Sequence, residues 1–103
     1  RRHPELSVYA ATKCAVMSFV ENVAKIEAPY GVTVNNVSPG AIATPRNAGV
    51  YNDEEARKKV EACIPAGRFG TPEDCAGIVA FLASDDSSYI TGADIKTDGG
   101  MSL

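Results

Sequence analysis

The sequence predicts an α/β fold in which two parallel strands are joined by a helical crossover. Three observations favour this fold: a long helical pattern comes first, two short β-rich runs follow it, and further helical patterns separate those runs. No tight hairpin signal joins the two runs, so we expect them to pair in parallel. With 103 residues, the chain is long enough for one small domain but short for an open α/β fold that binds a dinucleotide.

The first predicted element is a helix over Val8–Ala28, a stretch without Gly or Pro in which apolar residues recur at helical spacing. Pro29-Tyr30-Gly31 ends it. We expect one continuous apolar arc of this helix to face the sheet and the opposite, polar arc to face water. The apolar arc consists of Ala15, Val16, Phe19, Val20, Val23 and Ile26.

Two runs rich in β-branched residues are the predicted strands. Val32–Val37 is stopped by Ser38-Pro39-Gly40, and Ala93–Thr97 is followed by Asp98-Gly99-Gly100. We expect the two strands to lie side by side. Two strands alone make a small sheet whose edges have no cover.

Two helices are predicted between the strands. One runs over residues 52–64, with Asn52 or Asp53 as its N-cap. The other begins at Thr71, a capping hydroxyl followed by Pro and by acidic residues, and fades near Ser84.

Composition excludes several classes of function. The formal net charge is -3 and no block of Lys or Arg is present, which argues against a nucleic-acid surface or a polybasic membrane patch. No apolar run approaches the length of a membrane span, and the first residues lead into no apolar signal region. We expect a cytoplasmic protein that binds neither nucleic acid nor membranes.

Metal chemistry is not expected. Cys14, Cys63 and Cys75 are widely spaced without a Cys-x-x-Cys pair, and His3 is the single histidine, so no recognisable zinc site can be assembled. We expect the cysteines to be small buried thiols.

The first motif whose side chains could take part in a reaction is Tyr-Ala-Ala-Thr-Lys. In it, Tyr9 and Lys13 are four residues apart and adjacent on one helical face. A free tyrosine hydroxyl has a pKa of about 10, too high for acid–base chemistry at neutral pH. A nearby cation favours the phenolate and lowers that pKa. Tyr9 could then protonate a carbonyl oxygen as hydride arrives at carbon, or take the proton in reverse. The alternative is a surface contact between the two side chains.

The second motif is residues 35–44, Asn-Asn-Val-Ser-Pro-Gly-Ala-Ile-Ala-Thr, at the end of the first strand. Open α/β sheets bind ligands just beyond the carboxyl ends of their strands. Gly40 would let a planar ring approach the backbone, and Pro39 would fix the turn leading to it. Backbone groups near Ile42 and the hydroxyl of Thr44 could bond an amide and a phosphate. The alternative is a plain turn that ends a strand.

Together with Thr91-Gly92 and the closing Asp98-Gly99-Gly100, these motifs resemble the short-chain dehydrogenase/reductase family. Its members carry a YxxxK helix, an N-x-V-x-PG-x-I-x-T strand and loop, and a closing T-G-x-x-x-x-x-D-G-G. The resemblance runs from about Val8 to Met101. Within the family, the chain looks most like bacterial glucose 1-dehydrogenases, and 3-oxoacyl-[acyl-carrier-protein] reductases share the same motifs.

The resemblance implies an oxidoreductase that uses NAD or NADP to interconvert a small-molecule alcohol and a carbonyl by hydride transfer. It makes Tyr9 the catalytic acid/base, while Lys13 lowers its pKa and bonds the nicotinamide ribose. Pro39 and Gly40 would lie against the nicotinamide ring. Ile42 would bond the carboxamide through its backbone, with the Thr44 hydroxyl nearby.

The resemblance also implies that residues 1–103 are the C-terminal part of a single Rossmann-type domain, a doubly wound parallel sheet. The family's catalytic Ser and its glycine-rich phosphate loop lie upstream of the Tyr, at positions that here precede Arg1. We therefore expect the half that binds most of the dinucleotide to be absent. Residues 46–67 match the variable substrate-binding segment. Two hypotheses remain open: a piece of a complete oxidoreductase, or a truncated, non-catalytic remnant that acts only through association with a complete subunit.

Assembly is the last expectation. Ala10, Cys14 and Met17 form a strip of the first helix beside the Tyr/Lys pair. Family members commonly form dimers or tetramers through this helix, so we expect the full-length protein to be a homo-oligomer. The alternative is that the missing half of the same subunit covers the strip.

Overall fold

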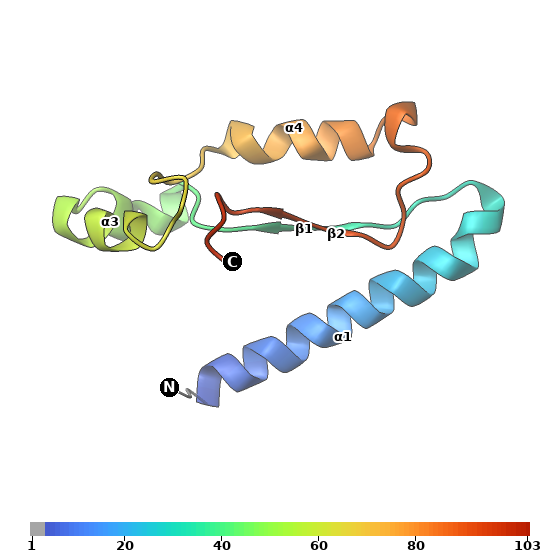
Figure 1. The fold of residues 1–103 in the computed structure, drawn as a ribbon, viewed down its shortest axis with the longest axis horizontal. Helices are drawn as coiled ribbons and strands as arrows, with labels where there is room; N and C mark the ends of the chain where they lie inside the picture. Colours follow the sequence, from blue (N-terminus) through green and yellow to red (C-terminus); the bar gives the residue numbers. More distant parts are fainter. Residues whose placement is uncertain (1–3) are drawn as a thin grey trace.

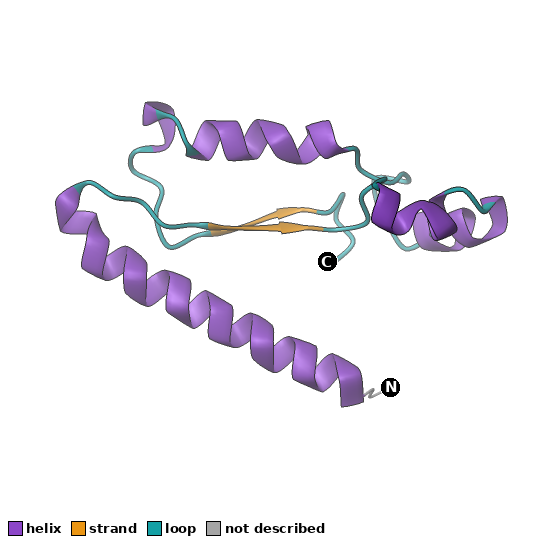
Figure 2. Ribbon diagram, turned by 180° about the vertical axis from the view of Figure 1, so that it is seen from behind, coloured by secondary structure: helices purple, strands orange, loops and turns teal. Residues whose placement is uncertain are grey.

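The computed structural model describes residues 4–103 and arranges them in three layers, with a small sheet in the middle. The helix α4 covers one face of the sheet and α1 lies along the other, as Figures 1 and 2 show from opposite sides. The short helices α2 and α3 lie beyond the carboxyl ends of the strands (Figure 1). In chain order the elements are α1 (Pro4–Glu27), the 3-10 turn η1 (Ala28–Tyr30), β1 (Asn36–Pro39), the 3-10 turn η2 (Pro45–Asn47), α2 (Ala48–Tyr51), α3 (Glu54–Glu61), α4 (Pro72–Leu82), the 3-10 turn η3 (Asp85–Ser87) and β2 (Asp94–Thr97).

The first helix is confirmed. It begins at Pro4, one turn earlier than predicted, because the fixed φ and missing N–H of proline suit a first helical turn. It ends at Glu27, where η1 takes over. Gly31 then adopts the left-handed conformation, with φ 75°, and its N–H donates to Ala28 O at 3.0 Å.

The parallel pairing of the two strands is confirmed as well. β1 pairs with β2 in parallel, in a register that sets Asn36 opposite Asp94 and Pro39 opposite Thr97. The bounds of β1 differ from the prediction, which placed the strand over residues 32–37. Residues 32–35 are not part of the regular ladder, and they contact the neighbouring segment through irregular bonds, such as Val34 N to Thr91 Oγ1 at 3.0 Å.

The strand continues through Pro39, which the sequence had suggested as its stop. In β1, Asn36 N donates to Ala93 O at 2.8 Å and Gly40 N donates to Thr97 O at 3.1 Å. The even-numbered residues of β1 therefore make the hydrogen bonds to β2. The backbone nitrogen of Pro39, which has no hydrogen to donate, faces the other edge of β1, where the described residues form no further strand.

The helices between the strands follow their local signals. Asp53 caps α3, accepting from Glu55 N and Ala56 N, as one of the two predicted caps. The helix stops at Glu61 rather than Ile64, and the residues between form turns. α4 starts after Thr71 with a complete capping box, as predicted, and ends at Leu82. α2 was not predicted from the sequence.

The packing of α1 contradicts the expectation that its apolar arc faces the sheet. In the described structure Phe19 is 68% exposed and Ile26 is 63% exposed, whereas Val20 and Ala24 are buried. The face toward the sheet carries Lys13, Val20 and Ala24, spaced by whole helical turns.

The reason for this orientation lies at both ends of the helix. Near its C-terminal end, the small Ala24 allows close approach to the chain before β2: a Cβ on Gly92 would lie 3.7 Å from Ala24 Cβ. Toward its N-terminal end the helix diverges from the sheet (Figure 1), and there the long Lys13 side chain spans the gap to Ser38.

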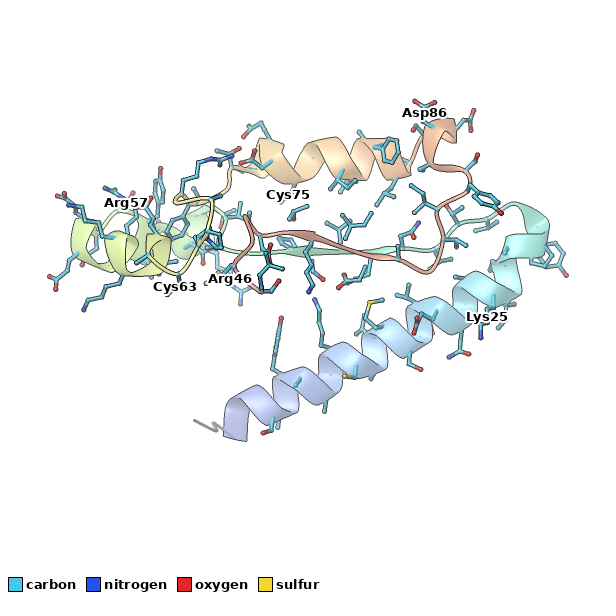
Figure 3. All side chains as sticks on the ribbon, viewed as in Figure 1. Lys25, Arg46, Arg57, Cys63, Cys75 and Asp86 are labelled. Carbon is cyan, nitrogen blue, oxygen red and sulfur yellow. The ribbon has the colours of Figure 1, made fainter. Side chains whose placement is uncertain are left out.

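The cysteines also depart from expectation. Cys14 and Cys63 are exposed, and only Cys75 is partly buried. Cys75 lies on the side of α4 toward the sheet (Figure 3), where its sulfur is 3.4 Å from Thr97 Oγ1. The thiol thus packs against the last residue of β2.

Candidate active site

The space between the N-terminal half of α1 and the carboxyl ends of the strands contains a pocket of about 300 Å³. On this side of the sheet, α1 diverges from the strands toward its N-terminal end (Figure 1). Four of the six residues singled out from the sequence line this pocket: Tyr9 and Lys13 from α1, and Pro39 and Gly40 from the end of β1. The other lining residues are Ser38, Asp94, Lys96, Asp98, Met101 and Ser102.

Tyr9 and Lys13 differ in how firmly they are held. Tyr9 is 64% exposed, so its ring borders the open side of the pocket. Lys13 is half-buried, and its Nζ donates to Ser38 Oγ at 2.5 Å. The helix therefore supplies an accessible phenol and, one turn further on, an anchored ammonium.

The Lys13 ammonium is bonded to a polar network formed by side chains of both strands. Ser38 Oγ donates to Asp94 Oδ1 at 2.8 Å, and Asn36 Nδ2 donates to the same carboxylate oxygen at 2.9 Å and to Ser38 Oγ at 3.0 Å. These bonds, together with the positive charges of Lys13 and Lys96, hold the pKa of Asp94 below its ordinary value. The carboxylate of Asp94 is therefore ionised at neutral pH.

Gly40 has a structural role that the sequence did not indicate. A Cβ at this position would lie 2.5 Å from Asp98 Cβ and 2.8 Å from Asp98 Cα. The chain leaving β2 thus crosses Gly40 too closely for any side chain. Glycine is required here by backbone packing, before any contact with a ligand is considered.

Ile42 and Thr44 do not line this pocket. Ile42 is buried and forms an isolated bridge with Gly70, through Ala43 N and Ala41 O. In such a bridge the N–H and C=O of Ile42 itself point away from Gly70, and its C=O already accepts from Asn47 Nδ2 at 2.8 Å. Thr44 precedes η2, and its side chain makes no capping bond there.

Sequence reasoning missed Ser38 and Asp94. A signal for both was present, because Asn36 and Ser38 alternate onto one face of the strand and Asp94 falls opposite Asn36 once the strands pair. Reading that signal required the register, which the motifs alone do not give. Met101 and Ser102 were also missed, since they follow the last predicted strand.

A second pocket, of about 290 Å³, lies on the α4 side of the strand ends. An ion pair borders it: Arg68 Nη1 lies 2.9 Å from Asp74 Oδ2. The bond from Arg68 and the backbone N–H of Thr71 lower the pKa of Asp74 to about 2. This pair and the capping box fix the turn that leads into α4.

Two further findings concern the described residues as a whole. Across residues 4–103, none of the helices combines the length and the apolar character needed to cross a bilayer. Within the same stretch, His, Cys, Asp and Glu side chains do not gather into a group of three that could hold a metal ion.

Comparison with known proteins identifies the family. A family model described as enoyl-(acyl carrier protein) reductase matches residues 1–102. The 3beta-hydroxysteroid dehydrogenase 1 of Eggerthella lenta is 45% identical over 100 residues, which cover 97% of this chain and 38% of that protein. The cyclohexanol dehydrogenase of a Rhodococcus species is 46% identical over 93 residues, covering 90% of this chain and 34% of that one.

Solved structures agree. A short-chain dehydrogenase/reductase from Serratia marcescens superimposes with a TM-score of 0.84 at 38% identity, covering 99% of this chain and 41% of that one. A putative NAD(P)-dependent gluconate 5-dehydrogenase from Beutenbergia cavernae, with bound NADP, gives 0.79 at 43% identity, covering 90% and 37%.

The fold, the order of the motifs and these matches place the chain in the short-chain dehydrogenase/reductase family. Its two strands and their helices correspond to a portion of the Rossmann-type doubly wound sheet of these enzymes, as predicted. The chain spans between 34% and 38% of the length of the two curated relatives described above.

Proposed function

We propose that this chain forms part of an NAD- or NADP-dependent oxidoreductase that interconverts an alcohol and a carbonyl by hydride transfer. The observation that carries the proposal is the convergence of Tyr9, Lys13, Pro39 and Gly40 on one pocket at the carboxyl ends of parallel strands. Open α/β sheets bind their ligands at this edge.

In this proposal Tyr9 is the acid/base. The Tyr9 O–H donates its proton to the carbonyl oxygen, which becomes the hydroxyl of the alcohol, and solvent returns a proton to the phenolate. In the other direction the phenolate takes the proton from the alcohol. The Lys13 ammonium stabilises negative charge on the phenol oxygen, because it lies one helical turn away.

The donors of the pocket fit a nicotinamide nucleoside. When bound, the reduced cofactor supplies the hydride that adds to the carbonyl carbon as its π bond to oxygen breaks. An ammonium has three N–H donors, and Lys13 uses one of them on Ser38 Oγ, which leaves two for the ribose hydroxyls. Outside this pocket, the Ile42 N–H is directed away from Gly70, and in this proposal it bonds the carboxamide, with Thr44 nearby. The family's solved members include proteins with bound NADP.

The substrate is a small molecule with a secondary alcohol or a ketone in this proposal. The relatives named above act on a hydroxysteroid and on cyclohexanol. Residues 46–67, which include α2 and α3, border the carboxyl ends of the strands and are the segment that we expect to contact the substrate.

A second candidate function has an observation of its own. Most of the apolar arc of α1 is exposed, with Phe19 at 68%. The radius of gyration is 16.1 Å, whereas a compact domain of 100 residues has about 13 Å. Such an open shape needs further protein surface to cover it. A non-catalytic remnant that pairs with a complete subunit would meet this need, as would the rest of a longer chain.

Replacing Tyr9 with Phe in the full-length protein tests the first proposal. The change removes the proton donor, so turnover should fall by at least about a hundredfold while cofactor affinity stays within about threefold. Tyr30→Phe, the same chemical change at a 78% exposed site after α1, is the control and should leave turnover unaltered. Full turnover in Tyr9→Phe would rule out the proposed acid/base.

The second candidate is tested with residues 1–103 alone. We expect this polypeptide to give no measurable oxidation or reduction with either cofactor, because the Tyr9 pocket is open on one side. Steady turnover from a preparation whose mass matches these residues only would contradict that expectation.

A further inference from the structure

Ser38 lies at the centre of the network beside Tyr9. Its hydroxyl oxygen is within bonding distance of three groups: Lys13 Nζ at 2.5 Å, Asn36 Nδ2 at 3.0 Å and Asp94 Oδ1 at 2.8 Å. A serine hydroxyl has one proton to donate and two lone pairs that accept. All of its bonding capacity is therefore used.

The direction of each bond is determined by its partners. The Lys13 ammonium and the Asn36 amide nitrogen carry only donors, so Ser38 Oγ must accept from both. The hydroxyl proton then has a single destination, Asp94 Oδ1. By accepting this hydrogen bond, the carboxylate orients the Ser38 hydroxyl so that a lone pair of its oxygen faces Lys13.

Asp94 is suited to that role by its state of charge and by its place in the sheet. Hydrogen bonds from Ser38 and Asn36, with the charges of Lys13 and Lys96 behind them, lower its pKa. Its Cα is paired with that of Asn36 in the parallel register, so the backbone fixes its distance from the Ser38 strand. A charged acceptor makes the stronger kind of hydrogen bond.

We propose that Asp94 is a positioning residue for the reaction: acting through the Ser38 hydroxyl, it holds the Lys13 ammonium at the mouth of the pocket for the cofactor ribose. The inference rests on the function proposed for Lys13. It assigns a role to Ser38 on β1 and to Asp94 on β2, neither of which belongs to the YxxxK motif.

A purely structural role is the competing explanation, since Asp94 also ties the two strands together through Asn36. The two explanations differ in one respect. If Asp94 acts through Lys13, its removal has no effect on cofactor binding once Lys13 is gone; if it only braces the sheet, the effects of the two changes add.

The experiment measures the dissociation constants of NADH and NADPH by fluorescence titration for four forms of the full-length protein: wild type, Asp94→Ala, Lys13→Ala and the double variant. In the wild-type background Asp94→Ala should weaken binding of the preferred cofactor by about tenfold, because Ser38 loses its only acceptor. In the Lys13→Ala background the same change should alter the constant by less than about twofold.

Three further variants test whether the effect comes from the acceptor at Asp94. Asp94→Asn keeps an oxygen acceptor at Oδ1 and should cost less than about threefold, whereas Ser38→Ala should reproduce the loss caused by Asp94→Ala. Asp86→Ala removes an exposed carboxylate in η3, at the far end of the molecule (Figure 3), and should leave binding unaltered. If Asp94→Ala does not fold, as judged by circular dichroism, Ser38→Ala takes its place in the cycle.

Each outcome decides one point. An equal loss in both Lys13 backgrounds, or no loss from Asp94→Ala in a wild type that binds cofactor, overturns the positioning role and leaves the proposed function standing. A wild type that binds neither NADH nor NADPH overturns the proposed function itself.

Discussion

Gly40 shows how one residue can serve both packing and a binding pocket. It lies where the chain leaving β2 crosses the end of β1, and it borders the pocket beside Tyr9. The sequence motif suggested a close approach by a planar ring, whereas the structure shows a close approach by Asp98. Both require the absence of a Cβ.

Replacing Gly40 with Ala should therefore lower the free energy of unfolding by about 1–3 kcal/mol, since the new Cβ would lie 2.5 Å from Asp98 Cβ. Chemical denaturation of the full-length protein measures this change in the free energy of unfolding. Gly49→Ala is the matched control, because nothing lies within 4 Å of a Cβ there and alanine favours the helix. Equal stability of the two variants would show that the strands can separate to admit a methyl group.

Lys13 offers a second residue-scale prediction. Lys13→Ala should weaken cofactor binding and also slow turnover, because it removes both the proposed ribose donor and the charge beside Tyr9. Lys25→Ala, the same change near the end of α1 at an exposed site (Figure 3), should alter neither. A loss in turnover with unaltered cofactor affinity would mean that Lys13 does not touch the ribose.

At the scale of elements, the start of α4 is a compact set of local interactions. Thr71 Oγ1 accepts from Asp74 N at 3.3 Å, and the Asp74 carboxylate accepts in return from Thr71 N at 2.7 Å. Thr71→Ala should cost about 1 kcal/mol of stability, as measured by denaturation. Thr12→Ala, on an exposed turn of α1, should cost less than about 0.5 kcal/mol.

The same turn carries a pH dependence. The pKa of Asp74 is lowered from 3.8 to about 2, so its contribution to stability is complete above about pH 4 and is lost as the pH falls toward 2. Asp74→Asn should therefore flatten the decline in stability between pH 4 and pH 2, as followed by thermal denaturation at a series of pH values. Because the pair is exposed, the effect should shrink at high salt.

These elements also show what the sequence could and could not reveal. The cap of α4 was predicted correctly, and the cap of α3 was one of the two residues predicted, because a cap is a local signal within four residues. The ends of β1 were not, because they depend on which N–H groups meet β2, a partner about sixty residues away in the chain. The pocket followed from the motifs, but the Ser38–Asp94 contact needed the register.

At the scale of the whole molecule, the orientation of α1 was the main failure of prediction. A helical pattern identifies an apolar face but not the layer that face will meet. Here contacts at Lys13 and Ala24 direct only one edge of the apolar arc, at Val20, toward the sheet and leave Phe19 and Ile26 exposed. We expect further protein surface to cover this face in the full-length protein.

Assembly of the full-length protein gives the last prediction. Ala10 and Cys14 are exposed on α1, and Met17 beside them is half-buried, so a second helix could approach closely. We expect a dimer or tetramer in size-exclusion chromatography with light scattering, and Cys14→Arg should shift it toward monomer by placing an unpaired charge in the contact. Cys63→Arg, at an exposed cysteine after α3, is the control. A monomeric wild type at micromolar concentration would refute the interface.

The parallel pairing of β1 with β2 has a consequence for how such a protein can diverge. Every residue that lines the Tyr9 pocket comes from α1, from the two strands, from Gly40 directly after β1 or from the turn after β2, and residues 41–93 contribute none. Lengthening a connecting segment is inexpensive, since doubling a loop costs only about 0.6 kcal/mol in closure entropy. Residues 46–67 can therefore be exchanged, extended or rebuilt while the register holds the proposed catalytic groups in place. If the proposed function holds, changes confined to this one stretch of the chain would admit new substrates to the same chemistry.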